Sequence, residues 1–335
     1  MSSRNLRVGL IGAGMMGKNH ARVVRDIDGA DLVVVADQQG DPHGVAKGIP
    51  LVSGLQEALT YDLDCAIVAV PTRLHEEIGV HLASQKVPTL IEKPLAGDPL
   101  AAARIADAFR ETGTVGSVGH IERFNPAVQE LQRRLAAGDL GEIFQIATRR
   151  QSSFPGRISD VGVAKDLATH DVDLTMAISA SDYVSVSAFT AHRSGRDTED
   201  MIVASGTLAN GAIVNHVVNW LSPLKERAIV VTGDSGIFVA DTLTGDLTLH
   251  RNGQFAIDWD SLSSFRGVSE GDVTRFAYPK KEPLKAQLEA FFAAVSSGET
   301  HSIASLADGL RVVEVVERLL ESATSGAIVS ATASN

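Results

Sequence analysis

The sequence of 335 residues contains a single cysteine, few aromatic residues and no long apolar run. Cys65 has no partner for an internal disulfide, and because it lies within an apolar stretch we interpret it as a buried, inert thiol. No stretch approaches the length of a membrane-spanning helix, and residues 1–5 lack the apolar core of a signal peptide. We therefore expect a cytoplasmic protein without a membrane partner.

Excess positive charge is also lacking. The 30 Lys and Arg residues face 41 Asp and Glu residues, which gives a formal net charge of −11 at pH 7. This balance argues against a general nucleic-acid surface or an anionic-membrane surface, so we expect no nucleic-acid partner. It does not exclude a phosphorylated small molecule, which a few local cations can hold. The length allows two domains, each with its own core.

The start of the chain has a dinucleotide-binding pattern. An apolar run, 7–11, is followed by Gly12-Ala13-Gly14-Met15-Met16-Gly17, a helical stretch, a second apolar run and Asp37. Gly12 permits a tight turn, Gly14 lets the backbone approach a pyrophosphate, and Gly17 lets the helix pack closely on the strands. Asp37 is placed to bind both ribose hydroxyls, and no nearby arginine would neutralise a 2′-phosphate, so NAD is favoured over NADP. The expected cofactor residues here are Gly12, Gly14, Met15, Met16, Gly17 and Asp37.

Strands and helices alternate up to residue 118, which predicts a doubly wound parallel sheet. Ligands of such sheets bind at the carboxyl ends of the strands. Lys93 follows one of these strands, and a lysine beside a cofactor can hold a substrate hydroxyl and stabilise the developing alkoxide. A solvated surface lysine is the alternative. The topology places Pro71, Thr72, His75, Glu92, Lys93 and His120 around one crevice, and all of these except His120 are expected to contact the cofactor as well.

The pattern changes at residue 143. Short β runs between glycine turns extend to about residue 250 and predict an antiparallel sheet, and amphipathic helices over 284–295 and 305–323 close the chain. A helix that begins near Ala164 carries Asp166 and His170 one turn apart, so that the carboxylate can orient the imidazole as a general base. A salt-bridged helix face explains the same spacing. Metal binding is a third reading, which we do not expect because no further ligands stand at coordination spacing.

The glycine motif, Glu92-Lys93-Pro94 and the later Asp166-x-x-x-His170 together resemble the Gfo/Idh/MocA oxidoreductase family over nearly the whole chain. The resemblance implies an NAD-binding Rossmann domain, residues 1–122. It also implies a substrate-binding and oligomerisation α/β domain with an open, mostly antiparallel sheet, residues 123–335. It implies catalytic or substrate-positioning work for Lys93, often beside a cis Lys93–Pro94 bond, and a general base in His170 with Asp166 as its partner. The residues implied to contact substrate are His120, Arg123 and Asn125, and Asn125 also suits a helix cap.

Residues 119–126, 160–173 and 219–227 resemble the branch of this family that oxidises UDP-N-acetylhexosamines at C3. Such a substrate needs cations for its diphosphate and planar groups for uracil. The alternative interpretations of the candidates named below are solvated turn residues for the cations and a core residue for the tryptophan. Lys165 departs from the branch, which has an apolar residue before the aspartate. The substrate candidates are Arg157, Trp220, Lys225 and Arg227.

We therefore expect an NAD-dependent dehydrogenase that oxidises a secondary ring hydroxyl to a ketone, with hydride passing to C4 of nicotinamide. The expected substrate is UDP-GlcNAc or its uronic acid, with oxidation at C3. The alternatives are an inositol 2-dehydrogenase or another polyol or aldose dehydrogenase, and a non-catalytic NAD-binding regulatory protein, against which Lys93, Asp166 and His170 argue. An apolar exposed face of the second sheet is expected to form a homodimer or homotetramer.

Overall fold

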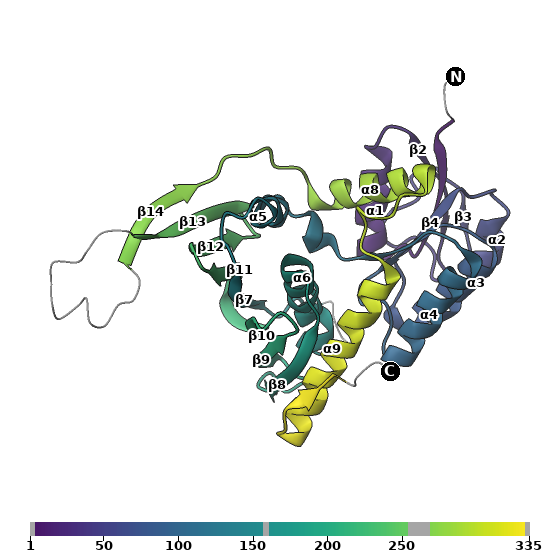
Figure 1. Ribbon diagram of the computed structural model, residues 1–335. Helices are drawn as coiled ribbons and strands as arrows, with labels where there is room; N and C mark the ends of the chain where they lie inside the picture. The colour runs from purple at the N-terminus through teal and green to yellow at the C-terminus, as the bar shows by residue number, and fades with distance from the viewer. Residues whose placement is uncertain (1–3, 157–160, 254–268, 332–335) are drawn as a thin grey trace, which may run out of the picture. The chain divides into compact units, whose positions relative to one another are not determined.

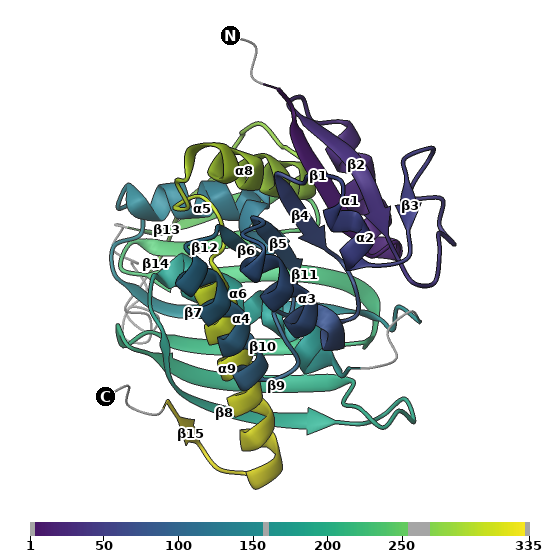
Figure 2. The same ribbon diagram turned by 90° about the vertical axis from the view of Figure 1, so that its right-hand side faces the viewer.

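The computed structural model describes residues 4–156, 161–253 and 269–331. They form two compact units, residues 1–124 with 281–317 and residues 125–280 with 318–335. Figure 1 and Figure 2 show the elements of both units, each of which is built around one sheet. The chain first passes from one unit to the other after residue 124, whereas the expected boundary was after residue 122. Residues 281–317 belong again to the first unit, which was not expected from the sequence.

The first unit contains a six-stranded sheet in the order β3-β2-β1-β4-β5-β6. All neighbouring strands are parallel, and the strand order reverses beside β1, where ligands of doubly wound sheets bind. β4 is buried along its whole length, as a parallel strand covered on both faces should be. The strands are β1 (Leu6–Ile11), β2 (Ala30–Ala36), β3 (Leu51–Val52), β4 (Cys65–Val68), β5 (Thr89–Glu92) and β6 (Gly116–Gly119).

Helices cover both faces of this sheet. One apolar cluster joins it to α3 and α4, and the other joins it to α1 and α8. The ends of α4 follow from the sequence: the Asp98 carboxylate accepts a hydrogen bond from the Ala101 N–H, Pro99 occupies the first turn, and Gly113 ends the helix in the left-handed region. The helices are α1 (Met15–Arg25), α2 (Leu55–Leu59), α3 (His75–Ser84), α4 (Pro99–Thr112), α8 (Pro283–Ser297) and the start of α9 (Leu306–Ser325), with 3₁₀ turns η1 (Thr72–Leu74) and η2 (Ile121–Phe124).

The second unit contains a nine-stranded sheet in the order β14-β13-β12-β11-β7-β10-β9-β8-β15. All pairs are antiparallel except β7 and β10, which run parallel. The predicted fold class is thus confirmed, but β7 separates β10 from β11, because alternating residues do not reveal which strands pair. The strands are β7 (Ile143–Ser153), β8 (Tyr183–Ala191), β9 (Met201–Leu208), β10 (Ile213–Asn219), β11 (Leu221–Gly233), β12 (Gly236–Asp241), β13 (Asp246–Gly253), β14 (Ser269–Arg275) and β15 (Val329–Ser330).

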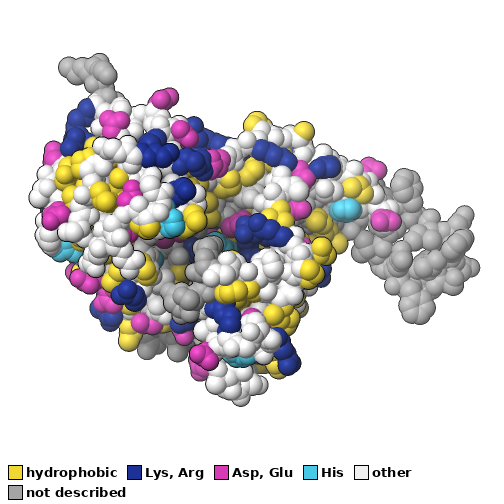
Figure 3. Space-filling view, turned by 180° about the vertical axis from the view of Figure 1, so that it is seen from behind, with side chains coloured by type: hydrophobic (Ala, Val, Ile, Leu, Met, Phe, Trp, Pro, Cys, Tyr) yellow, Lys and Arg dark blue, Asp and Glu magenta, His cyan; other side chains and the backbone are white. Residues whose placement is uncertain are grey.

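The helices of the second unit lie on one face of its sheet (Figure 1). α5 (Pro126–Ala136) packs on β12 and β13, and α6 (Thr169–Ser179) packs on β7. On the opposite face Phe189, Val203 and Ile213 are 72%, 40% and 53% exposed. Acidic and basic side chains intermingle over the side of the molecule drawn in Figure 3. Within the described residues no helix is long and apolar enough to cross a membrane, and the cytoplasmic location stays a prediction.

A buried histidine lies beneath α6 in the core of the second unit. His216 Nδ1 is 2.8 Å from the Thr148 hydroxyl, and Nε2 is 2.7 Å from the Tyr183 hydroxyl. Burial lowers the pKa of His216 to about 4. The folded unit therefore resists a proton that the unfolded chain accepts below about pH 6.5.

We expect the second unit to lose about 2 kcal/mol of stability between pH 7 and pH 5 because of His216. The stabilisation is complete above the unfolded pKa and is lost as the pH falls toward the folded pKa. Urea unfolding followed by tryptophan fluorescence measures it, because both tryptophans, Trp220 and Trp259, lie within residues 125–280. His216→Gln should flatten this pH dependence, and an equally steep dependence in the variant would refute the assignment.

Candidate active site

The glycine motif forms the turn between β1 and α1. Gly12 lies in the left-handed region with φ of +107°, and a Cβ there would approach the Ala69 carbonyl oxygen to 2.4 Å. A Cβ at Gly17 would lie 2.0 Å from the Gly12 oxygen, so α1 packs closely on the turn only because that atom is missing. Nothing lies within 4 Å of the corresponding position at Gly14, where space is left for a ligand.

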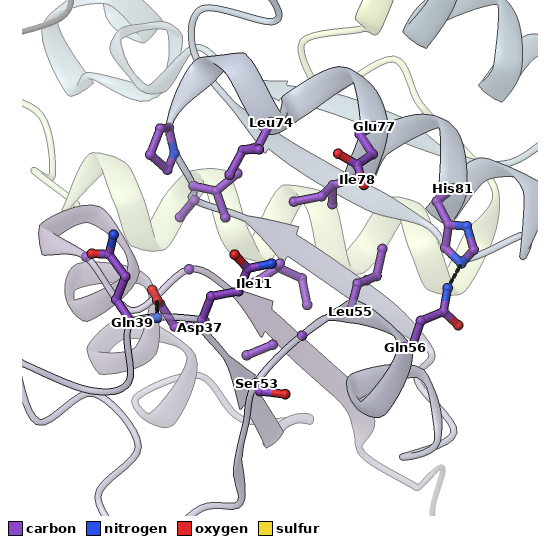
Figure 4. Close-up of a pocket in the computed structure, with 18 of the residues that line it drawn as sticks. Ile11, Asp37, Gln39, Ser53, Leu55, Gln56, Leu74, Glu77, Ile78 and His81 are labelled. Atoms are coloured by element: carbon purple, nitrogen blue, oxygen red, sulfur yellow. Dashed lines mark hydrogen bonds between the residues drawn. The ribbon is translucent and has the colours of Figure 1, made fainter.

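A cavity of about 660 Å³ lies beside this motif, within the first unit (Figure 4). The Asp37 carboxylate connects the glycine turn to the segment after β2. It accepts hydrogen bonds from the Ala13 N–H at 2.7 Å and the Gln39 N–H at 2.8 Å. Both polar and apolar side chains of α2 and α3 line the cavity, a mixture that is typical of ligand sites. The residues Gly12, Gly14, Asp37 and Pro71, all expected to bind the cofactor, line it.

The far wall of the cavity was not foreseen from the sequence. The Gln56 side-chain nitrogen of α2 lies 3.0 Å from His81 Nε2 of α3, and Figure 4 shows this pair beside Glu77 and Ile78. The sequence offered one indication of this wall: α2 and α3 each follow a strand that ends at this edge of the sheet. The expected cofactor residues Met15, Met16, Gly17, Thr72, His75, Glu92 and Lys93 are not part of the lining, and their contact with NAD stays a prediction.

Lys93 is half-buried and follows β5 directly, before a cis Lys93–Pro94 bond. His75 lies beneath the same segment: its Nδ1 is 3.0 Å from the Pro94 carbonyl oxygen, and its Nε2 is 3.0 Å from the Val70 carbonyl oxygen. Burial lowers the pKa of His75, although the carbonyl oxygens oppose that shift. His75 therefore connects the ends of two strands, β4 and β5, from below the surface.

The residues expected to contact substrate in 120–125 have structural partners of their own. His120 is 1% exposed, and the Arg123 guanidinium pairs with Asp308 at 3.0 Å. Asn125 caps α5 with its side-chain oxygen and donates from its side-chain nitrogen to the Thr242 carbonyl at 2.9 Å. These contacts show how each side chain is held, and the substrate contacts stay predictions.

The segment that carries Asp166 is a π-helical turn, η3 (Ala164–Ala168), and α6 begins only at Thr169. The expected single α-helix from near Ala164 is therefore wrong over its first turn. A π turn contains one extra residue and is frequent at functional sites, but it leaves no mark on apolar periodicity. Asp166 and His170 are both half-buried, on either side of the change in helix type.

Glu199, in the connection between β8 and β9, fixes the start of this turn. Its carboxylate accepts a hydrogen bond from the Ala164 N–H at 3.0 Å, and its carbonyl accepts one from the Val163 N–H at 3.0 Å. A Cβ at Gly162 would lie 2.0 Å from the same carboxylate, so the contact requires glycine there. Glu199 was not predicted from the sequence, because it lies 35 residues from its partner and belongs to no motif.

A buried ion pair anchors the start of α6 to the sheet. Arg150 Nε of β7 lies 3.0 Å from Asp171 Oδ2, and the two side chains are 3% and 2% exposed. Buried charges are tolerated only when they are well paired. Asp171 directly follows His170, so this pair fixes the backbone from which the expected base projects.

The candidates for a UDP site are found in different surroundings. Trp220 is 3% exposed, its ring meets Phe154 edge-on at 5.3 Å between centroids, and the Arg196 guanidinium lies 4.9 Å from its centroid. Lys225 is exposed on β11 and Arg227 is half-buried there, while Arg157 lies outside the described residues. Within the described ranges, no three His, Cys, Asp or Glu side chains are close enough to hold a metal ion.

Sequence profiles of known families match both units. The profile described as an oxidoreductase family with an NAD-binding Rossmann fold covers residues 6–120, and the Gfo/Idh/MocA C-terminal domain covers residues 128–239. The chain belongs to the Gfo/Idh/MocA family. It is accordingly an NAD-binding oxidoreductase, as its glycine motif and cavity indicate.

Several relatives in the Gfo/Idh/MocA family resemble the chain. Inositol 2-dehydrogenase 4 of Saccharopolyspora erythraea is 34% identical over 64% of this chain and 67% of its own length. UDP-N-acetylglucosamine 3-dehydrogenase of Acidithiobacillus ferrooxidans is 26% identical over 88% of this chain and 90% of its own length. The crystal structure of GenD2 from gentamicin A biosynthesis, in complex with NAD, is 26% identical, covers 99% of this chain and 98% of its own, and has a TM-score of 0.82.

Proposed function

We propose that the protein oxidises a secondary hydroxyl of a sugar or cyclic polyol to a ketone, and that its substrate is a UDP-N-acetylhexosamine or the uronic acid of one. The observation that carries the reaction type is the presence of Lys93 at the carboxyl end of β5, in an NAD-binding sheet, together with the Asp166–His170 pair of the second unit. The proposed substrate is supported by the similarity to UDP-N-acetylglucosamine 3-dehydrogenase over most of both chains.

The proposed chemistry uses each residue once. NAD supplies the hydride acceptor, so that CH–OH and NAD⁺ give C=O, NADH and a proton. His170 removes the hydroxyl proton, with Asp166 orienting its ring. The Lys93 ammonium hydrogen-bonds the same oxygen and stabilises the negative charge that develops on it. Removing this proton as the hydride leaves avoids a protonated ketone.

A second candidate, an inositol 2-dehydrogenase, is favoured by the relative with 34% identity. Two residues expected in the UDP site leave this alternative open. Trp220 is buried and Lys225 is exposed, and neither position by itself indicates a contact with a nucleotide. A free polyol needs neither diphosphate nor uracil contacts.

The two candidates are separated by NADH formation with UDP-GlcNAc, its uronic acid, myo-inositol and glucose, each with NAD. We expect NADH with a UDP-sugar, and a higher melting temperature with millimolar UDP alone, because a ligand that binds only the native state stabilises it. Turnover of myo-inositol without any UDP effect would establish the alternative. NAD binding without turnover of any of these would support the non-catalytic reading.

We also propose that the open face of the nine-stranded sheet pairs with a second copy of the chain. Phe189 is paired in register with Val203, and Val203 with Val217, so one apolar row crosses β8, β9 and β10 on the face opposite α6. A contiguous exposed apolar surface of this kind usually marks an interface.

The oligomer is tested by light scattering after gel filtration at micromolar concentration. We expect a dimer or tetramer in the wild-type protein and a shift toward monomer in two variants. Phe189→Glu places a charge in the apolar row, and Ile213→Glu places one at an exposed position of β10 on the same face. Leu100→Glu is the matched control, since Leu100 is equally exposed at 72% but lies on α4. A wild-type monomer would exclude the proposal.

A further inference from the structure

A buried histidine and a buried glutamate lie directly behind Lys93. His20 belongs to α1, Glu92 ends β5, and the imidazole Nε2 lies 2.7 Å from the carboxylate Oε1. His20 is fully buried and Glu92 is 8% exposed. The second carboxylate oxygen of Glu92 accepts a hydrogen bond from the backbone N–H of Lys93 at 3.2 Å. The carboxylate therefore connects the helix of the glycine motif to the backbone of the lysine.

A glycine on the neighbouring strand leaves room for this carboxylate. Gly119 of β6 stands opposite Glu92 in the parallel register, and a Cβ on Gly119 would lie 3.1 Å from both the carboxyl carbon and Oε2. Burial raises the pKa of Glu92, but the hydrogen bond with His20, together with the charge and the backbone N–H of Lys93, outweighs burial and holds this pKa below its ordinary value. Glu92 is thus a buried negative charge next to the lysine.

The geometry also favours one form of the His20 ring. Nδ1 is buried and has no hydrogen-bond partner among the described residues, whereas Nε2 faces the carboxylate. A proton on Nε2 forms the bond to Glu92, and a proton on Nδ1 would leave a buried donor unsatisfied. His20 is therefore best satisfied as an Nε2–H donor toward Glu92.

The segment after Lys93 is held in a comparable way. His75, at the start of α3, contacts the carbonyl oxygens of Pro94 at 3.0 Å and Leu95 at 3.2 Å. Buried histidines from two helices thus fix the residues on either side of Lys93. A reactive group needs such support, because a displacement of about 0.5 Å is enough to impair catalytic geometry.

We propose that His20 is a positioning residue that acts on Lys93 through Glu92. The inference rests on the proposed function, in which Lys93 holds the reacting hydroxyl. Glu92 fixes the lysine backbone and places a negative charge beside its ammonium, and His20 keeps the carboxylate in that place. The pair links the helix that faces the dinucleotide to the group that faces the substrate.

The test measures how fast Lys93 reacts with an amine-reactive acylating reagent in the full-length protein. Peptide mass spectrometry gives its rate relative to exposed Lys86. The rate depends on how firmly the segment of Lys93 is held and how readily the reagent reaches the side chain. We therefore expect His20→Leu and Glu92→Gln, which release this segment, to label roughly 3–10-fold faster at Lys93. His20→Gln, whose amide can donate in place of Nε2, should remain within about two-fold of wild type.

Two controls separate positioning from a general loss of structure. Val24→Ala removes buried volume from α1, where Val24 is fully buried, and it should lower the melting temperature without changing the Lys93 rate. If His20→Leu does not fold, Glu92→Gln and His20→Gln still decide the question. Unchanged labelling in folded His20→Leu and Glu92→Gln would overturn the inference, and so would equal labelling of His20→Gln and His20→Leu.

Turnover provides the second measurement. With whichever substrate the wild-type enzyme oxidises, kcat should fall roughly 10–100-fold in His20→Leu, recover in His20→Gln, and leave the KM for NAD nearly unchanged. The labelling experiment requires no substrate. If the wild-type protein oxidises no substrate and the variants still show the expected labelling, only the proposed function is contradicted. If the wild-type protein turns over a substrate and the variants label like wild type, only this inference is contradicted.

Discussion

Lys93→Ala and His170→Ala are each expected to reduce kcat by roughly 10²–10⁴-fold while NAD affinity stays within about two-fold of wild type. Removing the ammonium leaves the developing alkoxide without a charged hydrogen-bond donor. Removing the imidazole leaves the hydroxyl proton without a base. Neither side chain lines the cavity beside the glycine motif, so the dinucleotide should keep its contacts there.

Steady-state turnover with the identified substrate, and calorimetry with NAD, measure the two effects separately. Lys86→Ala and His192→Ala are the matched controls, because both residues are exposed. They should leave kcat unchanged. Asp166→Asn should cost less than His170→Ala, because it perturbs the orientation of the base but does not remove it. Wild-type kcat in either main variant would remove that residue from the mechanism.

The part of this site that the sequence predicted is local in the chain. Gly17 is required by the Gly12 carbonyl of the same strand–turn–helix unit, and Asp37 reaches the Ala13 N–H of that unit. The motif therefore predicts the turn and the helix, although the atom that excludes a side chain at Gly12 belongs to Ala69.

The part that the sequence did not predict depends on long-range contacts. Glu92 meets His20 across 72 residues, and Glu199 reaches Ala164 across 35. Both glutamates look like ordinary acidic residues until the fold brings their partners to them. The π turn before Thr169 was not predicted for a different reason. One extra residue in a turn changes the hydrogen bonding but not the pattern of apolar residues.

The order of strands was unpredictable for a related reason. The alternation in residues 143–250 correctly indicated strands and turns, but the parallel pairing of β7 with β10 joins strands that are far apart in the chain, and alternation within each strand does not reveal such a pairing. Arg150 illustrates this point, because in the sequence it is one of two adjacent arginines, and only the fold makes it a buried partner of Asp171.

Arg150→Met is expected to destabilise the second unit by about 3–5 kcal/mol, because it leaves the Asp171 carboxylate buried without its cation. The neighbouring Arg149→Met is the matched control. Arg149 is 57% exposed and lies 3.4 Å from Glu226, a surface pair whose loss should cost at most about 1 kcal/mol. Urea unfolding followed by tryptophan fluorescence reports on the second unit in both variants.

The double variant Arg150→Met with Asp171→Leu separates a missing charge from a missing side chain. If the uncompensated carboxylate causes the loss, replacing both partners by apolar groups should recover most of the stability. It should not recover kcat, because Asp171 fixes the backbone beside His170. A double variant as unstable as the sum of the single variants would show that Arg150 and Asp171 contribute independently, and that the start of α6 is held by other contacts.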